Sequence, residues 1–119
     1  MESYDKMNNQ DVRKIVLFLG IEDDSALWEI TMEKELYEMS ENQRISLARN
    51  AIRELLQEGL IELNKCKEPE RELTLIDDSD WDNVLSQQAA WVEPRVDAIS
   101  IRFYTTEKGK GVYWAMKKS

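Results

Sequence analysis

The chain has 119 residues, with 24 acidic and 16 basic side chains, a formal net charge of −8 and no histidine. Hydrophobic residues make up 42% of it and charged residues 34%. This length and composition predict one globular domain over residues 1–119. They exclude a disulfide-based scaffold and any mechanism that needs an imidazole, and the acidic surplus argues against strong non-specific binding to nucleic acid.

No stretch of the sequence is long and apolar enough to predict a membrane span, and the first residues lack the pattern of a signal peptide. The one cysteine, Cys66, lies between two lysines in a polar stretch. A lone cysteine fits a reducing compartment, so we expect a cytoplasmic location and an ordinary surface thiol. Thiol catalysis would need a base that this chain, without histidine, lacks.

Three helices are predicted in the first half of the chain from apolar residues at helical spacing. They cover residues 9–20, residues 25–39, and a stretch from Ser40 or Glu41 to Glu58. Gly59 follows the third helix, where a glycine predicts a left-handed helix end. Leu60 and Ile61 should then enter the core.

The second half mixes extended and helical patterns. We expect a strand over residues 71–76, a helix from Asp80 to about Ala90, and a strand over residues 98–104. A turn with two glycines then leads to the alternating Val112, Trp114 and Met116. This alternation favours a returning strand and therefore predicts a C-terminal β-hairpin, with Lys108 and Lys110 at its tip.

Two segments resemble the winged helix-turn-helix superfamily. In residues 48–61 a helix rich in alanine and leucine runs into Gly-Leu-Ile, as at the end of that family's third helix before the first wing strand. Residues 106–109, Thr-Glu-Lys-Gly, resemble its wing region. The resemblance covers about residues 9–63 and 98–117. It implies an α+β, winged-helix-like fold of three helices plus a C-terminal β-hairpin, with an inserted strand and helix over about residues 64–97.

The resemblance also implies a DNA-binding transcription regulator that would read the major groove with its third helix. The exposed face of that helix carries Arg49, Asn50, Arg53 and Gln57, which are residue types that read base edges and hold phosphates. Lys108 and Lys110 would contact the adjacent backbone. The other interpretation of this face is a solvated surface with Arg–Glu pairs. We favour it because the third helix carries no net charge.

Charge is distributed unevenly along the chain. Residues 1–41 contain 11 acids and 4 bases, whereas residues 99–119 contain 1 acid and 5 bases. Small acidic chains without catalytic motifs are similar to the immunity proteins that neutralise bacterial toxins. Our preferred hypothesis is a non-enzymatic immunity or inhibitor protein, whose carboxylates replace phosphates in the basic active site of a bacterial toxin such as a nuclease.

The expected partner-binding residues form an acidic front with one aromatic anchor: Glu22, Asp23, Asp24, Glu29, Glu33, Asp77, Asp78, Asp80, Trp81 and Asp82. We expect Trp28 and Trp114 in the core, and Trp81 and Trp91 to hold the insertion against it. No catalytic residue, cofactor or metal is expected. The run from Asp78 imitates the start of a calcium loop, but Asn83 stands where that loop needs glycine.

Overall fold

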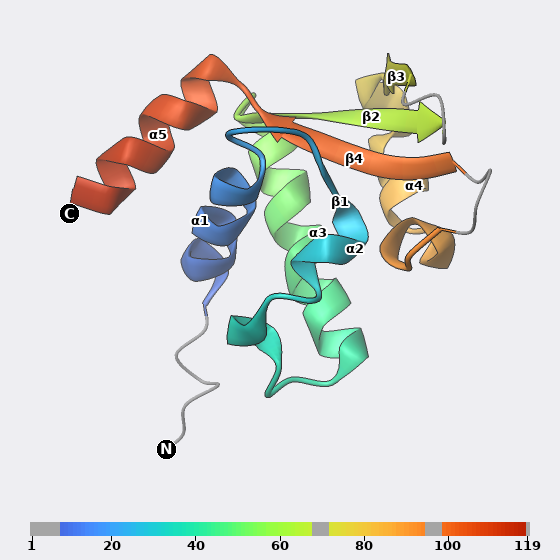
Figure 1. Ribbon diagram of the computed structural model, residues 1–119, viewed down its shortest axis with the longest axis horizontal. Coiled ribbons are helices and arrows are strands. Elements are labelled where there is room, and N and C mark those ends of the chain that lie inside the picture. The colour runs from blue at the N-terminus through green and yellow to red at the C-terminus, as the bar shows by residue number, and fades with distance from the viewer. Residues whose placement is uncertain (1–7, 68–71, 95–98, 119) are drawn as a thin grey trace.

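The computed structural model describes residues 8–67, 72–94 and 99–118, which form an α+β fold (Figure 1). Its helices are α1 (Asn9–Leu19), α2 (Leu27–Ile30), α3 (Glu41–Gln57), α4 (Trp81–Leu85) and α5 (Glu107–Lys118), with short 3-10 helices η2 (Lys34–Leu36), η3 (Asp78–Asp80) and η4 (Gln88–Trp91). Its strands are β1 (Ser25–Ala26), β2 (Ile61–Lys67), β3 (Glu72–Leu75) and β4 (Ile99–Thr105). They make one antiparallel sheet in the order β1-β4-β2-β3.

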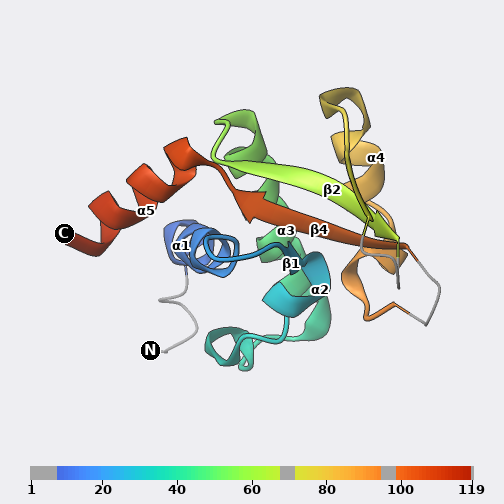
Figure 2. The same ribbon diagram turned by 45° about the horizontal axis from the view of Figure 1, so that its top comes forward.

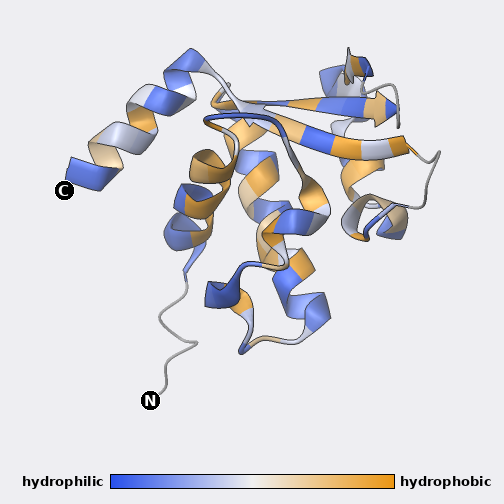
Figure 3. Cartoon of the chain, viewed as in Figure 1, coloured by the Kyte–Doolittle hydropathy of each residue, from blue (hydrophilic) through white to orange (hydrophobic). Residues whose placement is uncertain are grey.

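The helices α1 and α3 form where the sequence predicts them, and both begin at a capping box. Asn8 caps α1 and Ser40 caps α3, each accepting from the backbone N–H three residues on. Gly59, with φ of 75°, ends α3 in the left-handed region as expected. Arg13 then fastens α1 to α3 through Glu54 and Glu58, at 3.0 and 2.7 Å. The hydrophobic bands on the two helices in Figure 3 mark the stripes that meet the core.

The sheet packs against the helices on one side, and its other side is open at the Glu62–Tyr104 end, although Cys66 and Ser100 further along that side are buried. Leu63 and Phe103 pair across β2 and β4 and are both fully buried against the helices. Because side chains alternate along a strand, the neighbouring pair of Glu62 and Tyr104 points the other way. Figures 1 and 2 show no helix of the described residues lying across that side. The predicted strands over 71–76 and 98–104 are confirmed as β3 and β4, except for positions 71 and 98, which lie outside the described residues.

The predicted C-terminal hairpin is wrong, because residues 107–118 form the helix α5. Thr106 begins this helix: its hydroxyl oxygen accepts from the N–H of Gly109 at 3.1 Å and its O–H donates to the carbonyl of Gly59 at 2.9 Å. Gly109 and Tyr113, four residues apart, are both buried. The alternation of apolar residues therefore belonged to a helix that buries only one side, and Trp114, expected in the core, is 51% exposed.

Two other predicted helices are shorter than expected. The segment 25–39 contains β1, α2 and η2, because α2 ends where the hydroxyl of Thr31 donates back to the carbonyl of Trp28. The segment 80–90 is likewise broken between α4 and η4 at Gln87, whose backbone is extended. Cys66 is fully buried within β2, so the expected surface thiol is also wrong. Trp91 is 2% exposed and does hold the inserted segment against the core.

Candidate protein-binding site

A hollow of about 500 Å³ opens on the uncovered side of the sheet, between the turn after α1, the strands β2 to β4 and the start of α5. We call it the acidic hollow, because carboxylates dominate its charged lining. It is lined by Gly20, Ile21, Glu22, Asp23, Asp24, Glu62, Leu73, Tyr104, Thr105, Thr106, Glu107 and Lys110. The charged side chains of the lining are thus five carboxylates and one lysine, and part of the lining is apolar.

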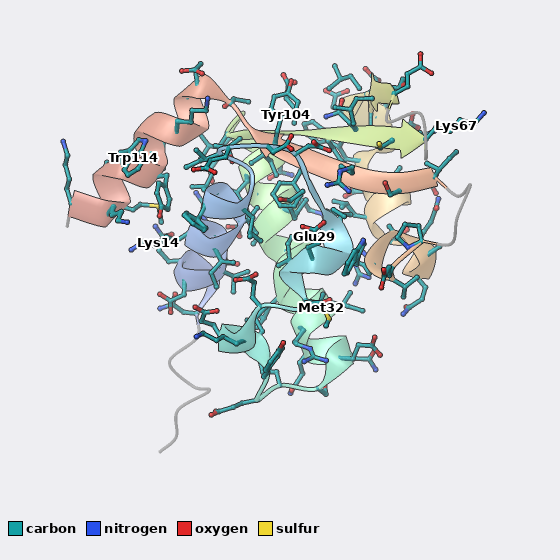
Figure 4. The ribbon with its side chains drawn as sticks, in the orientation of Figure 1. Lys14, Glu29, Met32, Lys67, Tyr104 and Trp114 are labelled. Atoms are coloured by element: carbon teal, nitrogen blue, oxygen red, sulfur yellow. The ribbon has the colours of Figure 1, made fainter. Side chains whose placement is uncertain are left out.

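The floor of the acidic hollow contains a hydrogen-bonded pair. The hydroxyl of Tyr104 donates to the Glu62 carboxylate across β4 and β2. That hydrogen bond, followed by burial and the negative charge of Glu62, raises the pKa of Tyr104 above its ordinary value. Tyr104 stands on the open side of the sheet in Figure 4. It therefore offers an aromatic surface next to a carboxylate, which suits the aliphatic stem and charged head of a lysine or arginine.

The wall formed by the turn before β1 is held by a buried ion pair. Arg102 donates to the Asp24 carboxylate through Nε and to the Asp24 carbonyl through Nη2 at 3.1 Å. The side chains of Arg102 and Asp24 are only 12% and 6% exposed. Glu29 lies 3.7 Å from the same guanidinium. Asp24 and Glu29, two of the expected partner-binding residues, thus both lie at the guanidinium of Arg102.

The rim carries the charges that remain available. Glu107 pairs with Lys110 at 3.0 Å. Glu22 and Asp23 are exposed, and neither has an ion pair among the residues that the structure describes. The Asp23 carboxylate accepts from the backbone N–H of Asp24 at 2.8 Å, which helps to orient it toward the rim. These two residues are therefore the strongest candidates for contact with a basic partner.

The other expected acidic residues lie elsewhere, so the structure divides the acidic front into separate groups. Asp77, Asp78, Asp80 and Asp82 belong to η3 and α4, beyond the opposite edge of the sheet from β1 (Figure 1). Asp77 caps η3 by accepting from Ser79. Trp81 is half-buried against the core. Glu33 precedes η2, and its pKa is raised, first by burial and then by the charges of Glu35 and Glu29.

The residues expected to read DNA are largely engaged within the chain. Arg49 donates to the carbonyl of Leu85 and lies over the Trp91 ring, and Arg53 donates to Asp82 at 2.9 Å. Asn50 and Gln57 stay exposed on α3. Lys108 donates to the carbonyl of Glu58, whereas Lys110 pairs with Glu107. The segment after β3 therefore covers part of the face that would enter a groove.

Sequence reasoning missed Glu62, Tyr104 and Glu107. The signal for Glu62 was present, because it lies between the apolar Ile61 and Leu63, and alternation in a strand would turn it to the opposite side. Its meeting with Tyr104 depends on the pairing of β2 with β4, which joins residues 42 positions apart in the sequence. Glu107 was not considered because its segment was predicted to be a turn, whereas it begins α5.

The described residues contain no group of three or more histidine, cysteine or carboxylate side chains placed to hold a metal ion. No helix in the described part of the chain is long and apolar enough to cross a membrane. Comparisons with protein-family models, with curated proteins and with solved structures found no match to this chain.

Proposed function

We propose that this chain is a non-enzymatic, cytoplasmic protein that binds a basic protein partner through the acidic hollow. The observation that carries the proposal is the gathering of five carboxylates and Tyr104 around one hollow on the open side of the sheet. Within this class, we propose an immunity or inhibitor protein that neutralises a bacterial toxin by occluding a cationic active site. The carboxylates would occupy the positions that nucleic-acid phosphates take in that site.

The contacts suggest different roles in binding for the residues of the acidic hollow. Asp24 is held by Arg102, so the turn that carries Glu22 and Asp23 is fixed before a partner arrives. A pre-ordered site loses less conformational entropy when it binds. The exposed rim charges would mainly accelerate encounter, and this effect is screened by salt. The Tyr104 ring and Leu73 would then cover the aliphatic part of an inserted lysine or arginine.

For the scaffold, we propose a winged-helix-like fold. Two observations support it. The elements follow one another along the chain as α1, β1, α2, α3, β2 and β4, and the strands lie in the sheet order β1-β4-β2. In this account β2 and β4, paired over seven positions, form the wing that was expected after residue 98. The insertion then lies between the two wing strands, and α5 is an addition at the end.

A DNA-binding transcription regulator is the second hypothesis, and the contacts of α3 weigh against it. Arg49 and Arg53 would have to leave Leu85, Trp91 and Asp82 to reach DNA. Each released contact would reduce the affinity gained from phosphates. A measurement separates the two hypotheses: binding to bulk duplex DNA at about 50 mM and 200 mM salt. Affinity that falls steeply with salt and is lost in Arg53→Ala would favour the regulator.

The protein-binding proposal is tested with charge reversals that are matched in number. We expect hexa-arginine to bind the wild type in calorimetry at low salt, and Glu22→Lys/Asp23→Lys to abolish that binding. Asp77→Lys/Asp78→Lys makes the same change in net charge outside the hollow and should weaken binding only slightly. Equal losses in both double variants would show that total charge, not the hollow, controls binding.

The inhibitor part of the proposal has its own test. A toxin and its inhibitor are expected to be encoded together, so the product of the adjacent gene is co-expressed with this chain. We expect the wild type to restore growth and Glu22→Lys/Asp23→Lys to fail, while Asp77→Lys/Asp78→Lys still restores it. If the adjacent product is harmless alone, or if the hollow variant protects fully, the inhibitor proposal is contradicted.

A further inference from the structure

An aromatic groove of about 330 Å³ lies between the end of α1 and α5, next to the acidic hollow. It is lined by Phe18, Leu19, Ile21, Glu22, Asp23, Tyr113 and Trp114. Phe18 and Trp114 are 58% and 51% exposed. Their rings flank Tyr113, with centroid separations of 5.9 and 5.2 Å. Two large side chains exposed together on one groove mark an interaction surface, because tryptophan and phenylalanine are enriched in the cores of interfaces.

The helix that carries Trp114 projects from the body of the molecule. Figures 1 and 2 both show α5 running away from the sheet beside α1, and Figure 4 shows Trp114 along its exposed length. Among the residues that the structure describes, α5 packs on one side, through Gly109 and Tyr113 with support from Val112 and Met116. Its other side, which includes the exposed Trp114, would be available to a second molecule without rearrangement of these residues.

Charges of opposite sign lie at the two ends of this surface. Glu22 and Asp23 border the groove at the turn after α1. Lys117 lies one turn beyond Trp114 along α5, with its Nζ 6.0 Å from the Trp114 ring centroid, and Lys118 follows it. A strongly basic partner would be attracted at one end and repelled at the other. A second copy of the same surface, turned by a two-fold rotation, would instead set each acidic end against a basic end.

We infer that the aromatic groove is a self-association surface, through which two copies of this chain form a symmetric dimer. Phe18 and Trp114 of each copy cover those of the other, and Lys117 of each copy lies against the other's Glu22 and Asp23. Glu22 and Asp23 line both the groove and the acidic hollow, so the dimer would compete with a basic partner for these two residues, whereas the floor residues Glu62, Leu73 and Tyr104 line the hollow alone. This inference does not depend on the proposed function, since its test needs no other molecule.

The aromatic contribution is tested by sedimentation velocity on the intact chain, from about 1 to 200 µM in low salt. We expect a dimer that dissociates on dilution, and at least a tenfold weaker association in Trp114→Ala. Tyr37→Ala removes an aromatic side chain that is equally exposed, at 57%, but lies near η2. It should leave the association unchanged. Thermal unfolding of each variant verifies that it is folded.

The charge pairing is tested by a swap. Glu22→Lys and Lys117→Glu should each weaken the dimer, and the double variant Glu22→Lys/Lys117→Glu should recover most of the loss, because it restores opposite charges at both ends. A wild type that remains monomeric at about 200 µM overturns the inference, and the occupant of the groove would then be a different protein. Equal effects of Trp114→Ala and Tyr37→Ala, or a double variant no better than the singles, also overturn it.

Discussion

Arg49 and Trp91 donate hydrogen bonds to the same acceptor, the carbonyl oxygen of Leu85. The Arg49 Nε and the Trp91 Nε1 each lie 2.9 Å from it. The Arg49 guanidinium also lies 5.9 Å from the centroid of the Trp91 ring. One carbonyl at the end of α4 thus joins the exposed face of α3 to a buried tryptophan of the inserted segment. This contact engages Arg49 within the chain.

This shared acceptor predicts coupled losses of stability. Trp91→Ala should lower the free energy of unfolding by about 3–5 kcal/mol, because it empties a fully packed site. Arg49→Ala should cost about 1–2 kcal/mol through the lost hydrogen bond and stacking. The double variant should cost less than the two single losses together, since the groups share one contact. Urea unfolding measures all three variants, with the exposed Asn50→Ala as the control. A loss from Arg49→Ala no larger than from Asn50→Ala would contradict the contact.

The two glycines of α5 predict opposite effects for the same substitution. A Cβ on Gly109 would lie 2.1 Å from the carbonyl oxygen of Leu60. Gly109→Ala must therefore displace the helix, and it should lower the free energy of unfolding by about 1–3 kcal/mol. A Cβ on Gly111 meets nothing within 4 Å. Gly111→Ala should therefore stabilise the helix by about 0.5–1 kcal/mol.

Thermal unfolding of the two glycine variants also tests the secondary structure of this segment. In a β-turn a glycine commonly adopts positive φ, and alanine there is destabilising. A clear loss of stability in Gly111→Ala would therefore favour the hairpin over α5. A stable Gly109→Ala would show that the start of α5 does not pack against Leu60.

Glu33 predicts a stability change that depends on pH. Burial, followed by the charges of Glu35 and Glu29, raises its pKa in the folded state above the unfolded value of about 4.3. The folded state therefore binds the proton more tightly, so stability falls as the pH rises from the unfolded to the folded pKa. Glu33→Gln should be more stable than wild type at neutral pH, and the difference should vanish below about pH 4.

Unfolding by urea at several pH values measures this effect. Glu93→Gln, which removes an exposed carboxylate in the same way, is the control for the substitution itself. A Glu33→Gln variant that is less stable than wild type at neutral pH would show that the ionised carboxylate is favoured in the folded state.

How far the sequence predicts this fold can be seen at α3 and α5. For α3, the apolar stripe, the cap at Ser40 and the left-handed Gly59 are all local signals, and they agree with the structure. For α5, the local signals conflict: two glycines and an alternating apolar pattern suit a hairpin. The conflict is resolved by a tertiary contact, because Gly109 allows the close approach of α5 to Leu60. That contact cannot be read from a short window of sequence, whereas the Thr106 cap is a local signal that the glycines and the alternation outweighed.

The candidate site shows the same limit. Composition indicates that carboxylates dominate the surface, but it does not show which of them are free. Asp24 and Asp82 look equivalent to Glu22 in the sequence, yet each binds an arginine, Arg102 and Arg53 respectively. Those pairs join residues 78 and 29 positions apart. The free rim residues can therefore be separated from the structural acids only after the sheet and the inserted segment are in place.

A backbone amide NMR titration of the isotope-labelled chain with hexa-arginine shows whether a cationic partner binds at the acidic hollow. We predict that the largest shifts fall on residues 22–24, Glu62, Tyr104 and Glu107, and that duplex DNA at the same salt concentration shifts nothing. Shifts centred on residues 77–82 with hexa-arginine, or on Asn50 and Gln57 with DNA, would contradict it.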